Sequence, residues 1–183
     1  MARWLQLGLI ATLGALSRPS HAAGLPPWEL GMSRAQVTNF VDFGPYKTFT
    51  NGDLETFNGI FDGQKENVQF FFNDSGLHRI GVYLYEGTDL TAAASKWKEC
   101  HETLARLYGS VETPGMTATA PTSTAALEEM ASKAIARVTG GDRVQMAPER
   151  QPDKVFIYSS FWMSTDQGTD YYFLTIFFDP PHP

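Results

Sequence analysis

The sequence predicts an α+β fold, in which one antiparallel sheet of about six strands is packed on one face by two to three helices. Runs with the two-residue alternation of strands fill two blocks of the chain. Two stretches with helical spacing separate these blocks, so strands and helices are segregated along the chain. With 43% hydrophobic and 13% aromatic residues among 183, the chain can build a packed core.

The first 22 residues have the composition of a secretory signal. A short basic start precedes the apolar run "WLQLGLIATLGAL", and "SHA" provides small residues for a cleavage enzyme. We expect cleavage between Ala22 and Ala23, which leaves residues 23–183 as a single exported domain, periplasmic or secreted. A buried N-terminal helix is the alternative for the signal, and a subdivision near 112–124 is the alternative for the domain.

The charge balance bears on the kind of partner. Removing Arg3 and Arg18 with the signal reduces 14 basic residues to 12, against 20 acidic ones, for a net charge of −8. An acidic domain of this kind is expected to bind nucleic acids poorly, because binding the phosphate backbone requires a basic protein surface. We expect another protein as the partner, with a preference for a basic one.

Cysteine usage and hydropathy limit the fold further. Cys100 is the only cysteine, so the chain has no intrachain disulfide. No cysteine comes directly after the signal, where a lipid would be attached. No second apolar run reaches the length of a membrane span. We therefore expect no membrane anchor after cleavage.

The stretch "WELGMSRAQV" predicts the first helix. Ser33 and Gln36 are spaced as a capping box, and Met32 and Val37 as a hydrophobic staple. The helix is expected over about residues 34–41, and "DFGP" should end it.

A strand-rich block follows this helix. Asn51-Gly52 is a strong hairpin signal between "YKTFT" and "DLETFNGIF". Turns are then expected at residues 62–67 and 73–76, flanking the strands "VQFFF" and "LHRIGVYLY". This pattern predicts an antiparallel meander of about four strands.

Two amphipathic helices are expected next, over residues 90–108 and from about residue 125 to 139. Between them, residues 112–124 are low in complexity and indicate a mobile surface connection. The chain ends with a weak strand at 142–147, strong strands at 154–163 and 170–178 joined by a hairpin at 164–169, and a tail expected to be frayed, "DPPHP".

No catalytic or metal-binding pattern is found in the sequence. G-x-S-x-G, H-x-x-x-H, C-x-x-C and a Gly-rich phosphate loop are all missing. Cys100 lies on the apolar stripe of its helix and is expected to be a buried structural thiol, whereas the neighbouring His101 is expected to be half exposed. His78 is expected to be an ordinary surface or sheet-edge histidine. We therefore predict no enzyme activity, no catalytic residue, no metal and no cofactor.

Aromatic side chains occur on both faces of the predicted strands. Alternation places Tyr83 and Tyr85 opposite the core face of one strand, and Tyr158 and Trp162 opposite the core face of another. Amphipathic aromatic residues on a helix-free sheet face are typical of protein interfaces, so these four are the candidate protein-binding residues. The alternative is that they are structural, covered by loops or filling cross-strand pairs.

The helix start "GMSRAQV", followed by a meander and an amphipathic helix, resembles a pattern of exported binding modules. It is similar to the small periplasmic modules of the SmpA/OmlA (BamE) type and to the half-domains of beta-lactamase inhibitory proteins. The resemblance covers about residues 28–85 and implies an α+β module that binds other proteins and has no catalytic residues. This chain differs in having no lipid-attachment cysteine, no disulfide, and one helix instead of two before the strands.

The sequence thus favours an exported protein-binding module, such as an envelope accessory, an inhibitor or an immunity-type protein. A small-molecule or lipid carrier is the second hypothesis, with Trp97 and Tyr108 as walls of a pocket between sheet and helices. A hydrolase that uses dispersed carboxylates is the third.

Overall fold

The computed structural model describes residues 24–116 and 123–181, so the predicted signal sequence lies outside the described part. Eight strands form one antiparallel sheet in the order β1-β2-β3-β4-β8-β7-β6-β5. The predicted α+β class is confirmed, with eight strands in place of about six. The strands are β1 (Lys47–Thr48), β2 (Leu54–Phe61), β3 (Gln64–Asn73), β4 (Gly76–Gly87), β5 (Val111–Glu112), β6 (Val144–Pro148), β7 (Phe156–Asp166) and β8 (Thr169–Asp179).

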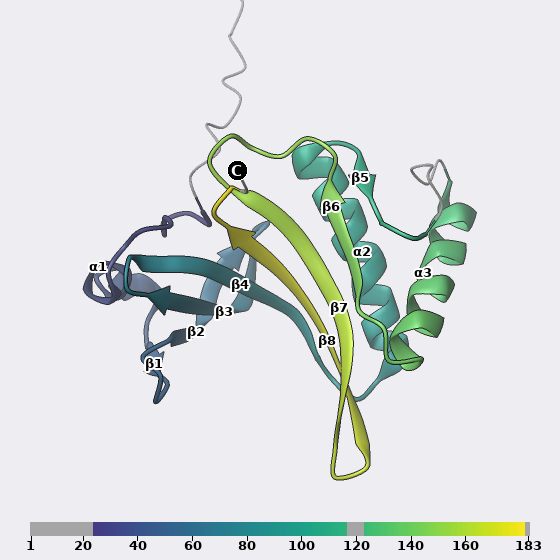
Figure 1. The fold of residues 1–183 in the computed structure, drawn as a ribbon, viewed down its shortest axis with the longest axis horizontal. Helices are drawn as coiled ribbons and strands as arrows, with labels where there is room; N and C mark the ends of the chain where they lie inside the picture. Colours follow the sequence, from purple (N-terminus) through teal and green to yellow (C-terminus); the bar gives the residue numbers. More distant parts are fainter. Residues whose placement is uncertain (1–23, 117–122, 182–183) are drawn as a thin grey trace, which may run out of the picture.

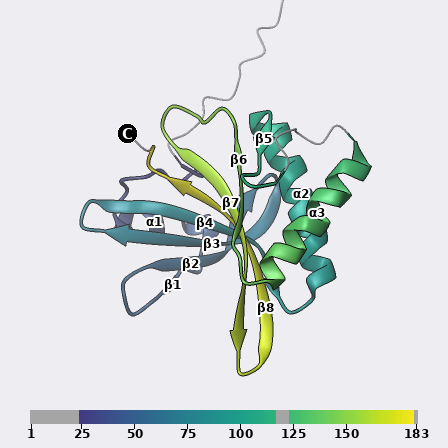
Figure 2. The same cartoon turned by 45° about the vertical axis from the view of Figure 1, so that its right-hand side comes forward.

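The two long helices, α2 (Leu90–Tyr108) and α3 (Thr124–Thr139), pack against each other and against the β6–β8 part of the sheet (Figures 1 and 2). The short helix α1 (Arg34–Thr38) and the 3-10 turn η1 (Val41–Phe43) lie at the other end, beside β1–β3 (Figure 1). Buried side chains of the three helices belong to one core cluster, and the partly buried Phe43 of η1 packs against it. One face of the sheet therefore carries the core, and the opposite face carries no helix of the described residues.

The start of α1 has the predicted capping box. The backbone N–H of Gln36 donates to the Ser33 hydroxyl at 3.3 Å, and the backbone N–H of Ser33 donates to the Gln36 side chain at 2.8 Å. Val37 is fully buried, as the staple requires, and Met32 packs against the core. The helix ends at Thr38, three residues earlier than expected, and η1 follows it.

The hairpin turns are tighter than the sequence analysis predicted. The turn expected at residues 62–67 consists of Asp62 and Gly63 alone, both with positive φ, as in a type I′ turn. Gln167 and Gly168 form the matching turn between β7 and β8. Because such two-residue turns follow the right-handed twist of the strands, the strands extend up to them. The β7–β8 hairpin consequently projects beyond the other strands (Figures 1 and 2).

Two expectations about irregular segments are corrected. Asp179, expected in a frayed tail, is the last residue of β8 and is buried. In the connection expected to be mobile, residues 112–124, Glu112 forms β5 together with the preceding Val111, and Thr113 and Met116 are buried. Residues 117–122 and 182–183 lie outside the described residues.

The core contains the strand side chains that point to the helix-covered face of the sheet, which is every second residue along a strand. Ile80 and Val82 of β4 are fully buried, as predicted from the period of that strand. Strands from before and after residues 112–124 share this core, because β4 pairs with β8 from Ile80↔Phe178 to Gly87↔Tyr172. Among the described residues, no helix is long and apolar enough to cross a membrane.

Candidate functional site

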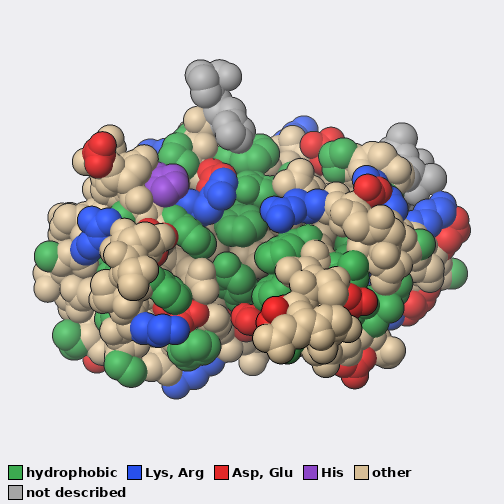
Figure 3. Space-filling view, turned by 60° about the horizontal axis from the view of Figure 1, so that its bottom comes forward, with side chains coloured by type: hydrophobic (Ala, Val, Ile, Leu, Met, Phe, Trp, Pro, Cys, Tyr) green, Lys and Arg blue, Asp and Glu red, His purple; other side chains and the backbone are tan. Residues whose placement is uncertain are grey.

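The helix-free face of the sheet carries a set of partly exposed aromatic side chains, which we call the aromatic face. Cross-strand register places these residues together, because Gly81 pairs with Phe177, and Phe177 pairs with Tyr158. In Figure 3, hydrophobic side chains gather across the middle of the surface, with charged groups around them. The members of the aromatic face are Phe71, Tyr83, Tyr158, Trp162, Phe173 and Phe177.

Three of the four predicted binding residues lie on the aromatic face. Tyr83 donates its hydroxyl hydrogen to the side-chain oxygen of Gln69 at 3.1 Å, and burial raises its pKa. Trp162 stacks on Phe173 of the neighbouring strand, with ring centroids 4.3 Å apart and planes 14° apart. Tyr158 lies 5.3 Å from the Phe177 ring. The rings are thus held by cross-strand neighbours while part of each stays exposed.

Tyr85 is separated from this set by a β-bulge. β4 has one extra residue between the pairs Tyr83↔Thr175 and Tyr85↔Leu174. The extra residue brings Tyr85 opposite Leu174, which is buried in the core. Tyr85 therefore packs against the core as well. Its hydroxyl donates to the backbone oxygen of Asp89 at 2.8 Å, next to the start of α2. The prediction that Tyr85 shares a face with Tyr83 is wrong, because simple alternation fails at a bulge.

Glycine at position 81 lets the aromatic rings lie against the sheet. A Cβ atom there would come within 3.2 Å of the Phe177 ring and 3.3 Å of the Phe71 ring. These distances are shorter than ordinary carbon contacts. Gly81 therefore lies below the two rings, on the strand that carries Tyr83.

One margin of the aromatic face is closed by an ion pair. The Arg79 guanidinium donates from Nε to Asp179 Oδ1 at 2.7 Å and from Nη2 to Oδ2 at 2.6 Å. It also lies 4.9 Å from the centre of the Phe177 ring and donates to the Tyr158 hydroxyl at 3.2 Å. The hydrogen bond to Asp179 raises the pKa of Arg79, and burial raises the pKa of Tyr158. These contacts fix the orientation of both rings.

Two fully buried hydroxyl groups lie between the aromatic rows. Ser160 pairs with Thr175 across β7 and β8, and Thr175 pairs with Tyr83 across β8 and β4. Neither the Ser160 nor the Thr175 hydroxyl has a hydrogen-bond partner among the described residues. The centre of the aromatic face therefore consists of small residues, and the neighbouring aromatic rings cover them.

Three members of the aromatic face, Phe71, Phe173 and Phe177, were not singled out from the sequence, and neither was Arg143, which lies beside the face. Phe173 and Phe177 continue the alternation of β8, so the period of that strand could have placed them opposite the core. Arg143 lies just before β6, and its guanidinium is 5.1 Å from the centre of the Trp162 ring. A residue outside a regular strand has no period that could assign it to a face.

A second surface feature lies at the edge of the sheet near β2. Among the described residues, three large hydrophobic side chains are well exposed: Val41, Phe57 and Ile60. η1, which includes Val41, contacts β2, which carries the other two. β1 covers the outer edge of β2 only at Leu54 and Glu55.

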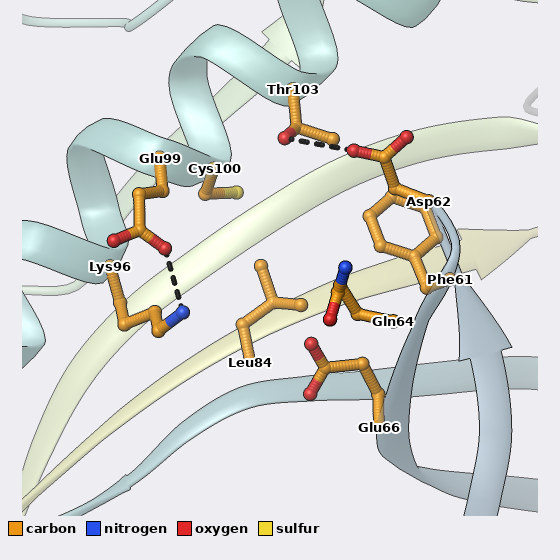
Figure 4. Close-up of a pocket in the computed structure, with 9 residues that line it drawn as sticks. All are labelled: Phe61, Asp62, Gln64, Glu66, Leu84, Lys96, Glu99, Cys100 and Thr103. Atoms are coloured by element: carbon orange, nitrogen blue, oxygen red, sulfur yellow. Dashed lines mark hydrogen bonds and ion pairs between the residues drawn. The ribbon is translucent and has the colours of Figure 1, made fainter.

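A narrow cavity lies on the helix side of the sheet, between the β2–β3 hairpin, β4 and α2 (Figure 4). Its volume is about 80 Å³, and Phe61, Leu84 and Cys100 form its apolar part. Lys96 and Glu99 at its rim form an ion pair of 2.6 Å, and burial raises the pKa of Glu66 opposite them.

The charged groups around this cavity also tie elements together. Asp62, at the turn of the β2–β3 hairpin, accepts hydrogen bonds from Arg106 and Thr103 of α2. The hairpin is thereby fastened to the helix. Among the described residues, no group of three or more His, Cys, Asp or Glu side chains is arranged to hold a metal ion.

The residues considered for chemistry on α2 are buried. Cys100 is 1% exposed, as expected for a structural thiol, and burial raises its pKa to about 12. His101 is 6% exposed, so the expected half exposure is wrong, and burial lowers its pKa. The Nδ1 atom of His78, expected at the surface, is buried without a hydrogen-bond partner in the described chain. Cys100 and His101 are therefore poorly placed to meet a substrate.

The chain was compared with protein families, with curated proteins and with solved structures, and none of the three comparisons gives a match.

Proposed function

We propose that this chain is an exported, non-enzymatic protein that binds another protein through the aromatic face. The observation that carries the proposal is the stacked pair Trp162–Phe173 beside Tyr158 and Phe177, partly exposed on a face that no described helix covers. Rigid aromatic side chains supply large contact area at a low entropic cost. An envelope accessory, an inhibitor and an immunity-type protein would all use such a surface.

The arrangement of charges supports the same proposal. The Arg79–Asp179 pair is satisfied within the chain, so a partner would meet rings whose orientation is already fixed. Pre-orientation reduces the side-chain entropy that binding must overcome. The net charge of −8 expected for the exported form would speed association with a partner that presents basic groups.

The carrier alternative has less support. Trp97, proposed as a wall of an internal pocket, is fully buried in the core. The cavity of Figure 4 is lined by neither Trp97 nor Tyr108. For the hydrolase alternative, the cavity is lined by the carboxyl groups of Asp62, Glu66 and Glu99. Asp62 already accepts hydrogen bonds from Arg106 and Thr103, and Glu99 is already paired with Lys96.

The test is affinity capture from an extracytoplasmic extract, with the purified exported product as bait. We expect a partner that the wild type retains and that Tyr158→Ala with Trp162→Ala loses, because truncating such anchors costs about 2 kcal/mol or more each. The control is Glu129→Ala on α3, an exposed residue on the other side of the sheet. Equal capture by all three baits would contradict the proposal. Mass spectrometry of the same product should show that it begins at Ala23.

A further inference from the structure

A single row of side chains crosses the aromatic face over three strands, β4, β8 and β7, and ends at the residue just before β6. Glu86 of β4 pairs with Phe173 of β8, and Phe173 pairs with Trp162 of β7. Arg143 completes the row, because the next residue, Val144, pairs with Phe161, the residue before Trp162. The row therefore reads acid, aromatic, aromatic, base. With neighbouring strands about 4.8 Å apart, its two charged ends are separated by roughly 14 Å of sheet.

Both charged ends of the row are exposed and unpaired. Within the described residues, neither Glu86 nor Arg143 forms an ion pair, although Arg143 lies over the Trp162 ring. This contrasts with the Arg79–Asp179 pair at the margin of the same face. An occupant of the face would therefore meet a free negative charge at one end of the row and a free positive charge at the other.

We infer that the aromatic face binds a second copy of this chain, in a two-fold symmetric dimer. A rotation about an axis that runs along the strands, between Phe173 and Trp162, reverses the order of the row. It brings Glu86 of each copy opposite Arg143 of the other and stacks the aromatic residues between them. The same rotation places Phe177 opposite Tyr158 of the second copy, because these two also pair across β7 and β8.

Charge complementarity is what selects this occupant. A two-fold interface uses the same patch on both copies, so the patch must be complementary to its own reversed image. The row from Glu86 to Arg143 meets that condition, and two twisted sheets can pack face to face in an aligned manner. The inference rests on the proposed function, that this face binds protein, and it names a second copy of this acidic chain as the occupant in place of a partner with a net basic charge.

The test uses charge reversal and sedimentation equilibrium of the exported product. The measurement is made in about 0.15 M salt, where the Debye length of about 8 Å screens the repulsion between two acidic chains. We expect a dimer. Glu86→Arg alone and Arg143→Glu alone should each weaken it at least about 10-fold, because each places like charges together at both ends of the interface. The combined variant should recover the wild-type affinity to within about 3-fold, since both ends are then opposite again.

The matched controls lie on α3, on the other side of the sheet. Glu129→Arg and Lys133→Glu change the net charge by the same amounts and should leave the dimer unchanged. Thermal unfolding of every variant verifies that each is folded, as expected for substitutions of exposed residues.

A chain that stays monomeric at about 100 µM, above the range of micromolar interfaces, would overturn the inference. It would also be overturned if the combined variant were as weak as the single ones, because only a self-pairing row can be rescued by reversing both ends. If that monomer still captured a different protein through Trp162, the proposed function would stand and the occupant would be a different chain.

Discussion

Asp179 accepts two parallel hydrogen bonds from the Arg79 guanidinium, at 2.7 Å and 2.6 Å, and so joins the last residue of β8 to β4. The Asp179 side chain is 9% exposed and that of Arg79 is 37% exposed. Bidentate pairs of this kind are among the stronger hydrogen-bonded contacts in proteins, although the partial exposure of Arg79 weakens this one.

We therefore expect Asp179→Ala to lower the free energy of unfolding by about 1–2 kcal/mol, measured by urea denaturation. Removing the carboxylate leaves the half-buried guanidinium with the Tyr158 hydroxyl as its one remaining acceptor among the described residues. Asp170→Ala, a change at an exposed residue of the β7–β8 hairpin, is the control and should cost less. Equal costs for the two variants would show that the Arg79 pair adds nothing.

Two tryptophans distinguish the aromatic face from the core. Trp97→Ala should lower the free energy of unfolding by about 3–5 kcal/mol, because this fully buried ring would leave a cavity. Trp162→Ala should lower the free energy of unfolding by only about 1 kcal/mol, mainly because it removes the stacking on Phe173. If urea denaturation gave similar losses for both, Trp162 would be a core residue and the aromatic face would be structural.

The buried thiol predicts a loss of stability at alkaline pH. Burial raises the pKa of Cys100 from 9.0 to about 12, so the folded chain holds this proton more tightly than the unfolded chain. The stabilisation is complete below pH 9 and is lost as the pH rises toward 12. The advantage of wild type over Cys100→Ala should therefore shrink by about 1 kcal/mol between pH 8 and pH 10. If the difference in the free energy of unfolding between wild type and Cys100→Ala stayed constant over this range, the pKa of the thiol would not be raised, and the thiol would be accessible to solvent.

The buried imidazole predicts the opposite trend at acid pH. Burial lowers the pKa of His101 from 6.5, and its Nε2 has no hydrogen-bond partner in the described chain. The unfolded chain therefore binds the proton first as the pH falls below 6.5, and stability is lost over that range. Urea denaturation at pH 7.5 and pH 5 should show a smaller loss for His101→Gln than for wild type. Identical losses would indicate that His101 is charged in the folded protein.

Regular periodicity made much of the fold predictable. The amphipathic pattern of α2 predicted its boundaries and its termination at Gly109. The alternation of β7 predicted that Tyr158 and Trp162 lie opposite Ile157 and Phe161, because a strand without a bulge keeps its two faces separate.

Features set by long-range contacts were not predictable in this way. The bulge that moves Tyr85 depends on how β4 pairs with β8, far away in the sequence. β5 has two residues, too few to show a period, and pairs with β6 only through the fold. Asp179 looked like part of a polar tail because its partner, Arg79, is 100 positions away.

The most direct test of the central proposal is site-specific photo-crosslinking in the exporting cell. A photoreactive phenylalanine analogue at position 162 keeps an aromatic ring on the aromatic face, and the same analogue at position 129 on α3 is the control. We predict a discrete covalent adduct with another protein chain from position 162 and none from position 129, with an adduct of twice the chain mass if the occupant is a second copy. The absence of an adduct at position 162, or equal adducts at both positions, would contradict the account.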